Sequence, residues 1–180
     1  MRIRVQSLST LNSQLSTRAR AFTLLELLAA ITIIAILAGI VIGAGRRASE
    51  TGKIARARAE LAVLGAALED YRRAYGDYPR TDDEAQLLRA LLGQRGPASD
   101  AAIAGRALIE AARFNIVAEA LRDPWDRPYV YAYKTQNPWT NSSYVLYSAG
   151  PDGADAPALL AGGFPDVAPA ANLDNIPANR

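Results

Sequence analysis

The 180-residue sequence contains no cysteine and no histidine. These absences exclude disulfide bonds, thiolate metal sites, cysteine nucleophiles and every mechanism that needs an imidazole. A zinc site would have only carboxylates as ligands, which is unusual for that metal. Half of the residues are apolar, so the composition still allows a packed core in a chain of this length.

Proline and tyrosine are missing from the first part of the chain. All ten prolines lie at or after Pro79, and all eight tyrosines lie at or after Tyr71. The proline-free part is rich in Leu, Ala, Ile and Arg, whereas the remainder is rich in turn residues and aromatics. This division predicts a long helix followed by a small globular head.

Acidic side chains are absent from residues 1–21, which carry four arginines. The whole chain has a net charge of +2, and without those four arginines it has 16 basic and 18 acidic groups, a net charge of −2. A nucleic-acid-binding protein needs a basic face. The charge count predicts no such face, so we expect no nucleic acid among the partners.

Residues 22–45 form a long apolar run that contains a single charged residue, Glu26. As a helix the run would extend about 36 Å, enough to cross a hydrocarbon layer of about 30 Å. A cleavable secretory signal is disfavoured, because its apolar core is shorter and ends at a small-residue cleavage site. The run therefore predicts a membrane anchor, but basic residues flank it on both sides and leave its orientation undecided.

Glu26 is the informative residue of this run. A carboxylate inside an apolar span costs a few kcal/mol and is usually paired, yet the span contains no basic side chain. Two interpretations remain open. Glu26 snorkels to the membrane surface, or it pairs with a new amino group after a cut before Phe22, which is spaced i,i+4 from Glu26 on one helix face.

Residues 18–28, RARAFTLLELL, resemble the prepilin cleavage and methylation motif of type IV pilins and type II secretion pseudopilins. The resemblance implies that a membrane peptidase cuts between Ala21 and Phe22 and methylates the new amino group of Phe22. It also implies that Glu26 pairs with the amino terminus of a neighbouring subunit. The family usually has Gly at the position of Ala21, and the small size of Ala predicts that cleavage survives.

Residues 46–75 continue the helix with a narrow apolar stripe. Spacings of three and four alternate along it, as on one face of an amphipathic helix. The stripe consists of Ile54, Ala57, Leu61, Leu64, Leu68, Tyr71 and Tyr75. Gly76 and the following Asp-Tyr-Pro predict the end of the helix. A helix from residue 22 to 75 would be about 80 Å long, so its first half has to pack in lipid or against other copies.

The head is predicted to begin with two helices. Residues 82–93 form the first, with Thr81 as N-cap, Glu84 completing a capping box and Gly93 closing the helix. Residues 100–121 are predicted to form the second from the spacing of their apolar side chains.

Two strands and a long tail are expected next. Alternation over residues 129–133 and a second β-rich segment at 143–148 predict an antiparallel hairpin packed on the long helix. The tail after Ser148 reads as a long loop rich in Gly, Pro, Ala and Asp. Its acids suit Ca²⁺, which accepts oxygen ligands at varied geometry, but scattered Asp residues in loops are more often turn formers. Those acids are Asp152, Asp155, Asp166 and Asp174.

Four segments resemble, in order, the head of the major pseudopilin of type II secretion: residues 71–79, 123–131, 148–153 and 174–176. In that family the loop after the hairpin binds Ca²⁺, so the resemblance implies a calcium site here. The implied ligands are the Ala149 carbonyl, Asp152 and Asp174, with Asp155, Asp166 and Asn175 as further candidates. The chain departs from the family at Asp126, where Gly is usual, and in the 100–121 helix, which resembles an insertion.

The resemblance implies an α+β, type IV pilin-like fold in four parts. These are a leader that is removed (1–21), a transmembrane and assembly segment (22–45), an amphipathic half-helix (46–76) and a periplasmic head (77–180). The implied function is that of a structural subunit, the major pseudopilin, in a helical periplasmic filament that drives protein export. The protein is expected to span the bacterial inner membrane once. The implied partners are copies of itself, the prepilin peptidase, the inner-membrane secretion platform and minor pseudopilins.

Two alternatives remain at this point. One is a type IV pilin or minor pseudopilin for motility, adhesion or DNA uptake, although DNA uptake would favour a basic head. The other is a membrane-anchored enzyme or binding protein. Paired carboxylates can perform acid–base chemistry, but the sequence offers no recognisable pair in an apolar setting and no evident nucleophile–base combination. We therefore expect no enzymatic activity.

Overall fold

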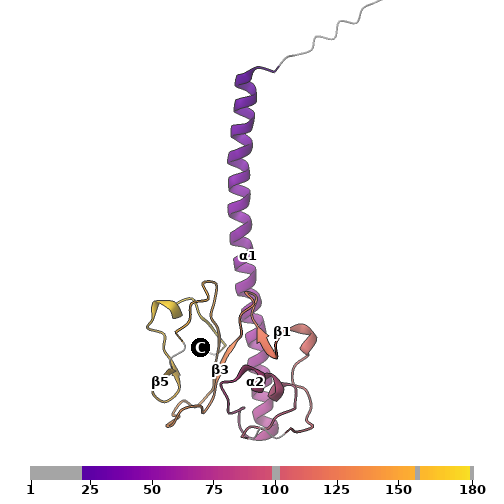
Figure 1. The fold of residues 1–180 in the computed structure, drawn as a ribbon, viewed down its shortest axis with the longest axis vertical. Helices are drawn as coiled ribbons and strands as arrows, with labels where there is room; N and C mark the ends of the chain where they lie inside the picture. Colours follow the sequence, from indigo (N-terminus) through magenta and orange to yellow (C-terminus); the bar gives the residue numbers. More distant parts are fainter. Residues whose placement is uncertain (1–21, 99–101, 157–158, 179–180) are drawn as a thin grey trace, which may run out of the picture. The chain divides into compact units, whose positions relative to one another are not determined.

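The computed structural model describes residues 22–98, 102–156 and 159–178, and the chain divides into two compact units between Gly43 and Ala44. Two helices, two 3₁₀ turns and seven short strands are described (Figure 1). In chain order they are α1 (Leu24–Tyr75), α2 (Glu84–Leu91), η1 (Ala111–Arg113), β1 (Asn115–Val117), β2 (Ala120–Arg122), β3 (Val130–Ala132), β4 (Val145–Ser148), β5 (Leu159–Leu160), β6 (Phe164–Pro165), η2 (Ala170–Asn172) and β7 (Ile176–Pro177).

The first unit contains the apolar start of α1, where Thr23 acts as the helix cap. The Glu26 amide donates to Thr23 Oγ1 at 3.1 Å, and the Leu27 amide donates to the Thr23 carbonyl at 3.1 Å. The bond to the Thr23 side chain satisfies an amide that has no partner inside the helix, and the bond to its carbonyl is the first bond of the helical ladder. Phe22 precedes the helix, so the expectation that Phe22 and Glu26 share one helix face is wrong.

The second unit contains the rest of α1 and the head, and the predicted stripe of α1 is confirmed. Five of its seven members are buried, and Ile54 and Tyr75 are partly buried. The buried members are Ala57, Leu61, Leu64, Leu68 and Tyr71. The helix ends at Tyr75, and Gly76 follows with a φ of +81°, in the left-handed region that favours glycine. The head packs against this stripe of α1.

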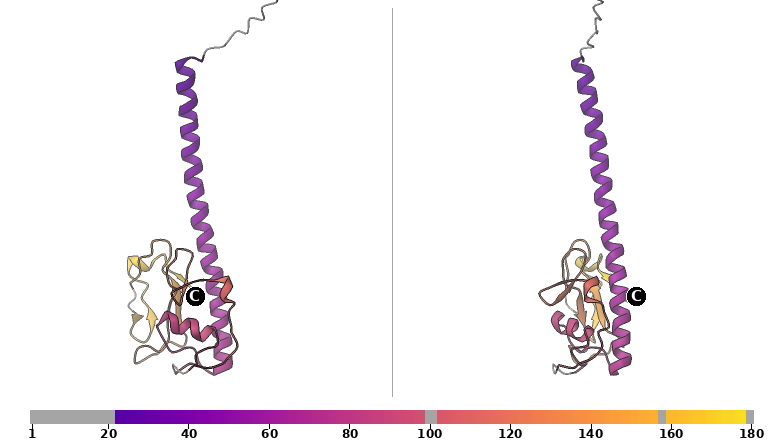
Figure 2. Two further views of the ribbon diagram at one scale, coloured as in Figure 1. Left: turned by 45° about the vertical axis from the view of Figure 1, so that its right-hand side comes forward. Right: turned by 90° about the vertical axis from the view of Figure 1, so that its right-hand side faces the viewer.

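A three-stranded antiparallel sheet with the order β3-β4-β7 forms the other wall of the core. The predicted hairpin is confirmed, because Tyr131 of β3 lies opposite Leu146 of β4. Both side chains belong to the same buried cluster as Leu61 and Leu64 of α1. The two views of Figure 2 show the sheet alongside the second half of α1.

The predicted helix at 100–121 is wrong. Residues 115–122 instead form the β1–β2 hairpin, which turns at Ala118 and Glu119 with φ angles of +52° and +61°. Before it, the Gly105 amide donates to the Gly93 carbonyl, and the Leu108 amide donates to the Leu91 carbonyl. Backbone groups that a helix would pair internally are therefore bonded to the end of α2.

Helix α2 is confirmed, but its cap differs from the prediction. Asp83 is the N-cap, and its side chain accepts a hydrogen bond from the Gln86 amide at 2.8 Å. Thr81 lies two residues earlier, and its hydroxyl accepts a hydrogen bond from the Asp83 amide. At the other end Gly93 closes the helix as expected, with a φ of +73°.

The tail after Ser148 is more ordered than a plain loop. Strands β5 and β6 pair with each other, and β7 pairs with β4, with Ser148 opposite Ile176. Ile176 is buried and belongs to the main core. The expected long loop therefore contains short paired strands, and the returning strand β7 anchors it to the sheet. The β5–β6 ribbon lies on the side of the head away from α1 (Figure 1).

Candidate assembly segment and candidate calcium loop

The candidate assembly segment is the start of the described chain, with Phe22 and Glu26 as its chemical groups. Both residues are exposed, and Phe22 is 72% exposed. The large apolar side chains that follow on α1 are also more than half exposed, from Leu24 to Ile42. Ala21, the other residue of the expected cleavage site, lies outside the described residues.

By length and composition, α1 is suited to crossing a membrane, and it alone has this property among the described helices. Exposed apolar surface of this extent requires a cover of lipid or protein. Glu26 lies near the start of this surface, in the first turn of the helix. A cationic group beside it would therefore pair with it in a medium of low dielectric constant. The segment can therefore anchor the chain and offer one carboxylate for pairing.

The candidate calcium loop, residues 148–155, meets the segment before β7. The Asp152 amide donates to Asp174 Oδ2 at 3.1 Å, and the Asn175 Nδ2 group lies 3.4 Å from Asp155 Oδ1. Residues that are about twenty positions apart in sequence thus lie in contact. The pairing of β4 with β7 explains this, because it places Ser148 opposite Ile176.

Two buried oxygens at this place have no hydrogen-bond partner among the described residues: Asp174 Oδ1 and Asn175 Oδ1. Buried polar groups without partners are costly, and they often mark the place of an ion or water. Both are oxygen ligands of the kind that Ca²⁺ prefers. The residues present therefore fit a hard cation at this position.

The remaining candidate ligands differ in how well they fit. The Tyr147 hydroxyl donates one bifurcated hydrogen bond to Asp155, with both carboxylate oxygens 3.0 Å from the hydroxyl oxygen. Burial, together with the neighbouring Asp155 carboxylate, raises the pKa of Tyr147 well above its ordinary value, so this hydroxyl remains a donor. Asp166 is bonded to another part of the tail, because its carbonyl accepts from Asn172 Nδ2. Its carboxylate accepts from the Ala168 amide, in the same way that the Asp152 carboxylate accepts from the Ala154 amide.

In the part of the chain that the structure describes, no three acidic side chains lie close enough together to hold a metal. A calcium ion at this loop would therefore bind two carboxylates at most and would need backbone carbonyl and amide oxygens for its other ligands. The buried Ala149, which precedes the loop's Gly150, supplies one such carbonyl in the expected set.

Sequence reasoning missed the side chains that hold this loop in place. The Arg127 guanidinium donates to the carbonyl oxygens of Gly150 and Pro151, and the buried Asp123 carboxylate accepts from the Ser148 hydroxyl at 2.6 Å. Asp123 at the start of an Asp-Pro-Trp turn is a sequence signal for a local cap. Arg127 has no comparable signal, since its partners are more than twenty residues away.

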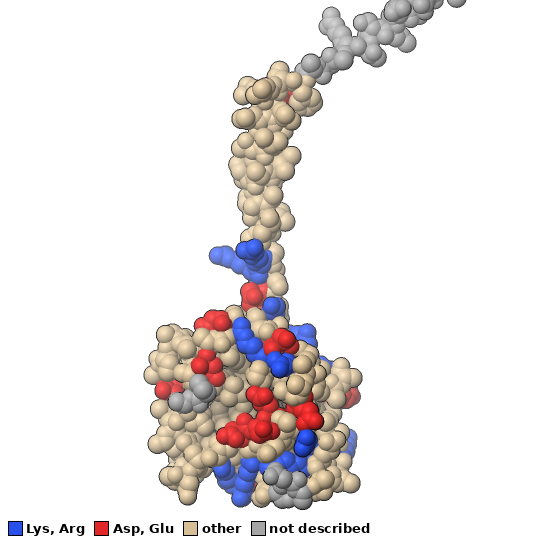
Figure 3. Space-filling model, in the orientation of Figure 1, with Lys and Arg blue, Asp and Glu red and all other residues tan. Residues whose placement is uncertain are grey.

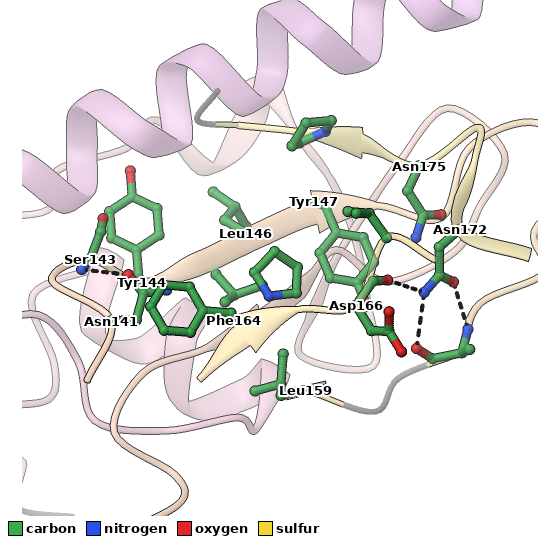
Figure 4. A pocket seen from close by; sticks show the side chains of 15 residues that line it. Asn141, Ser143, Tyr144, Leu146, Tyr147, Leu159, Phe164, Asp166, Asn172 and Asn175 are labelled. Carbon is green, nitrogen blue, oxygen red and sulfur yellow. Dashed lines mark hydrogen bonds between the residues drawn. The ribbon is translucent and has the colours of Figure 1, made fainter. Parts of the chain in front are cut away.

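A cavity of about 420 Å³ lies between β4 and the β5–β6 ribbon (Figure 4). Its lining is mainly apolar and includes Tyr147, Leu159 and Phe164. The Asn172 side chain at one end is bonded to the backbone of Ala156 and Asp166. These bonds occupy the amide group and indicate that Asn172 braces the loop.

Charges of both signs are mixed over the head. Acidic side chains gather over the middle of the face that Figure 3 shows, with basic ones around them. Asp77, for example, is hydrogen-bonded to Tyr133, Lys134 and Arg80. Burial opposes ionisation of the Asp77 carboxyl, but these hydrogen bonds hold its pKa well below its usual range. This face therefore lacks the uniform positive charge of a nucleic-acid-binding surface.

Comparison with known protein families decides the identity of the head. The model of the family described as "Type II secretion system (T2SS), protein G" matches residues 46–158, and the "Prokaryotic N-terminal methylation motif" matches residues 16–42. The chain belongs to the type II secretion system protein G family. This membership makes it a major pseudopilin of type II secretion and favours that interpretation over a type IV pilin for motility, adhesion or DNA uptake.

Two curated relatives of this protein G family member are named "Type II secretion system core protein G". The relative from Pseudomonas aeruginosa is 26% identical over 155 residues, covering 86% of this chain and 94% of the relative. The relative from Escherichia coli is 31% identical over 139 residues, covering 76% of this chain and 84% of the relative. No solved structure matched the chain. A membrane-anchored periplasmic protein is consistent with the family and with the apolar α1.

Proposed function

We propose that this chain is the repeating subunit of a helical filament that grows from the bacterial inner membrane into the periplasm and drives protein export. The observation that carries this proposal is a protein G head on a helix whose apolar start is exposed and bears one carboxylate, Glu26. The role is structural, without catalysis. Lipid covers the apolar surface before assembly, and neighbouring copies cover it in the filament.

Processing at the Ala21–Phe22 bond prepares the subunit for assembly. A prepilin peptidase cuts this bond and methylates the Phe22 amino group, leaving a cation next to the start of α1. That cation and Glu26 of a neighbouring copy form an ion pair in an apolar medium, where an unpaired carboxylate is costly. The inner-membrane secretion platform and minor pseudopilins are the further partners.

The test of assembly compares the wild type with Glu26→Ala and Glu26→Gln. Both variants should insert in the membrane, because loss of the charge makes the span more apolar, but both should give few filaments after shearing and pelleting. Exposed Glu84→Ala on α2 serves as the control and should assemble normally. Filament yields of Glu26→Ala that equal the wild type would refute the pairing role.

Processing has its own measurement, the intact mass of the membrane-extracted chain. We expect a chain that begins with methylated Phe22. Ala21→Gly should be cut at least as fast, whereas Ala21→Leu should stay uncut because the peptidase needs a small residue there. A membrane-extracted chain that retains Met1 would contradict the proposed cleavage.

The calcium site is part of the same proposal. The ligands would be the Ala149 carbonyl, Asp152 and Asp174, with the Asn175 side-chain oxygen as a further candidate. A bound Ca²⁺ would supply positive charge to the unpaired oxygens of Asp174 and Asn175. The ion would thereby fasten the loop to the segment before β7, in a chain that has no cysteine for a disulfide.

Thermal unfolding of the detergent-solubilised chain tests this site. A ligand at a hundredfold excess over Kd stabilises the folded state by about 2.7 kcal/mol, so Ca²⁺ should raise the melting temperature by several degrees. Mg²⁺ should do much less, since it demands octahedral geometry. Asp152→Ala and Asp174→Ala should abolish the increment, whereas Asp166→Ala should keep it. Equal melting temperatures of the wild type in Ca²⁺ and in chelator would refute the site.

A further inference from the structure

We propose that Arg127 is the positioning residue of the candidate calcium loop, holding residues 148–153 in their binding conformation before any metal arrives. The inference rests on the proposed calcium site for its functional meaning. Its structural part, that Arg127 orders this loop, is independent of the metal.

The guanidinium of Arg127 holds two consecutive carbonyls of the loop. Nη1 donates to the Gly150 carbonyl at 2.8 Å, and Nη2 donates to the Pro151 carbonyl at 3.3 Å. The planar fork of arginine suits two acceptors at once. It fixes the backbone on either side of the link between Gly150 and Pro151, directly before the candidate ligand Asp152.

Gly153 shows how closely the loop wraps around this side chain. A Cβ atom added to Gly153 would overlap with the Arg127 guanidinium, and Gly153 has a φ of +64°. Only glycine combines that backbone conformation with so little space. The loop from Gly150 to Gly153 is therefore curled around the guanidinium.

The opposite side of the loop meets the second group of candidate ligands. The Asp152 amide donates to Asp174 Oδ2, and a Cβ atom added to Gly150 would overlap with the Asp174 carbonyl oxygen. The loop therefore lies between the Arg127 guanidinium and the Asp174 carboxylate and is hydrogen-bonded to both. Any shift of the loop away from Arg127 would change the distance between Asp152 and Asp174.

Arg127 is itself fixed by a buried carboxylate. Asp123 Oδ1 accepts from the amides of Trp125 and Arg127 at 2.9 and 3.0 Å, while Asp123 Oδ2 accepts from the Ser148 hydroxyl. Ser148 Oγ in turn accepts from the Gly150 amide at 3.3 Å. The Asp123 carboxylate, which is 1% exposed, therefore ties the turn that carries Arg127 to the start of the loop.

This arrangement lowers the cost of metal binding. Ordering a free loop of several residues opposes binding by the conformational entropy that is lost, and a loop that is already held avoids that loss. Replacement of residues that orient metal ligands commonly weakens metal affinity by about 10–100-fold. We therefore expect Arg127→Ala to weaken Ca²⁺ binding by about tenfold or more.

The experiment uses the full chain in detergent and the variants Arg127→Ala and Arg127→Lys. The matched control is Arg89→Ala, because the Arg89 guanidinium on α2 is bonded to Glu119 and to no residue of the loop that the structure describes. Calorimetry with Ca²⁺ gives the Kd. Hydrogen exchange of residues 148–156 in chelator reports loop order without metal.

Support requires two results in Arg127→Ala: a Kd for Ca²⁺ raised about tenfold, and faster exchange of the loop in chelator. Arg127→Lys should lie between this variant and the wild type, since one ammonium lacks the fork. Wild-type exchange and wild-type Kd in Arg127→Ala would overturn the proposal and leave the calcium site standing. If the wild type binds no Ca²⁺, the calcium proposal fails, and the exchange measurement in chelator alone decides the role of Arg127.

Gly153→Ala provides an independent check through a double-mutant cycle. In the wild type the added methyl group would displace the guanidinium from the Gly150 and Pro151 carbonyls, so hydrogen exchange of the loop should be faster. In the Arg127→Ala background the guanidinium is absent, so Gly153→Ala should increase the loop's exchange rate by a smaller factor. If Gly153→Ala speeds loop exchange equally in both backgrounds, its effect comes from backbone strain alone. That result would overturn the proposed contact between Gly153 and Arg127.

Discussion

Replacing Tyr129 with Phe removes a single buried oxygen and should markedly destabilise the head. The Tyr129 hydroxyl donates to Glu60 Oε2 at 2.6 Å, joining the start of β3 to α1, and Tyr129 is 1% exposed. Burial, and next the Glu60 carboxylate, raise the pKa of Tyr129 well above its ordinary value, so the hydroxyl remains a donor.

The magnitude follows from the charge on the acceptor. Hydrogen bonds to charged groups contribute about 1.5–3 kcal/mol, more than bonds between neutral groups. Glu60 retains its ion pair with Arg56 at 2.7 Å in the variant, and Arg56 is largely exposed, so the carboxylate keeps one partner. We therefore expect Tyr129→Phe to lower the free energy of unfolding by about 2 kcal/mol. This is less than the loss expected when a buried charge is left without any partner.

A double-mutant cycle separates this bond from general packing. Glu60→Leu alone leaves the Tyr129 hydroxyl buried without its acceptor and should also destabilise. Combined with Tyr129→Phe it removes both polar groups, so the double variant should cost at least about 1 kcal/mol less than the sum of the two single variants.

Urea unfolding followed by tryptophan fluorescence measures these effects, because both tryptophans, Trp125 and Trp139, lie in the head. The control is Arg73→Ala, which breaks an exposed pair with Asp70 and should change stability by less than about 0.5 kcal/mol. A Tyr129→Phe variant within about 0.5 kcal/mol of the wild type, or a strictly additive cycle, would refute the reasoning.

Two further predictions concern pH and backbone strain. Burial raises the pKa of Tyr71 and of Tyr144 to about 12 each, so unfolded tyrosines ionise first. Stability that is present below about pH 10 should therefore be lost as the pH rises toward 12, and a free energy of unfolding that stays constant over this range would contradict this. Asp126→Gly should be neutral or stabilise by up to about 1 kcal/mol in urea unfolding, because its φ of +66° favours glycine. A loss above about 1 kcal/mol would show that the bond from Asn115 to Asp126 outweighs this strain.

The departure of Asp126 from the family pattern has a local explanation in the structure. The residue is in the left-handed region, where glycine is most at ease and where Asp is among the better tolerated alternatives. Its amide donates to the Asp123 carbonyl, closing the turn before Arg127. The turn keeps its shape, and the Asp123 carboxylate keeps its bonds to the amides of residues 125 and 127.

Sequence patterns with short repeats determined the parts of the fold that depend on local chemistry. The three-four spacing from Ala57 to Tyr71 set the buried face of α1, and the alternation at 129–133 set the inward face of β3, because side-chain direction follows directly from backbone periodicity. The apolar run of 22–45 likewise predicted a helix suited to crossing a membrane, and the motif around Phe22 predicted the match to the methylation motif, without any tertiary information.

The same local reasoning failed at 100–121, where tertiary contacts outweigh helical spacing. Residues 105 and 108 donate their amides to the end of α2, and residues 118 and 119 adopt left-handed conformations that close a hairpin. Apolar spacing alone does not distinguish a helix from a chain whose backbone bonds are made to another element.

The sequence by itself determined the helix, the hairpin, the processing motif and the acids available for a metal. Only the tertiary structure decided which of those acids meet: the β4–β7 pairing brings Asp152 and Asp155 to Asp174 and Asn175, while Asp166 is bonded elsewhere. It also revealed Arg127, whose partners lie 23 and 24 residues away. The physical reason is that strand pairing and buried hydrogen bonds join residues by position in space, and no repeat along the chain records that position.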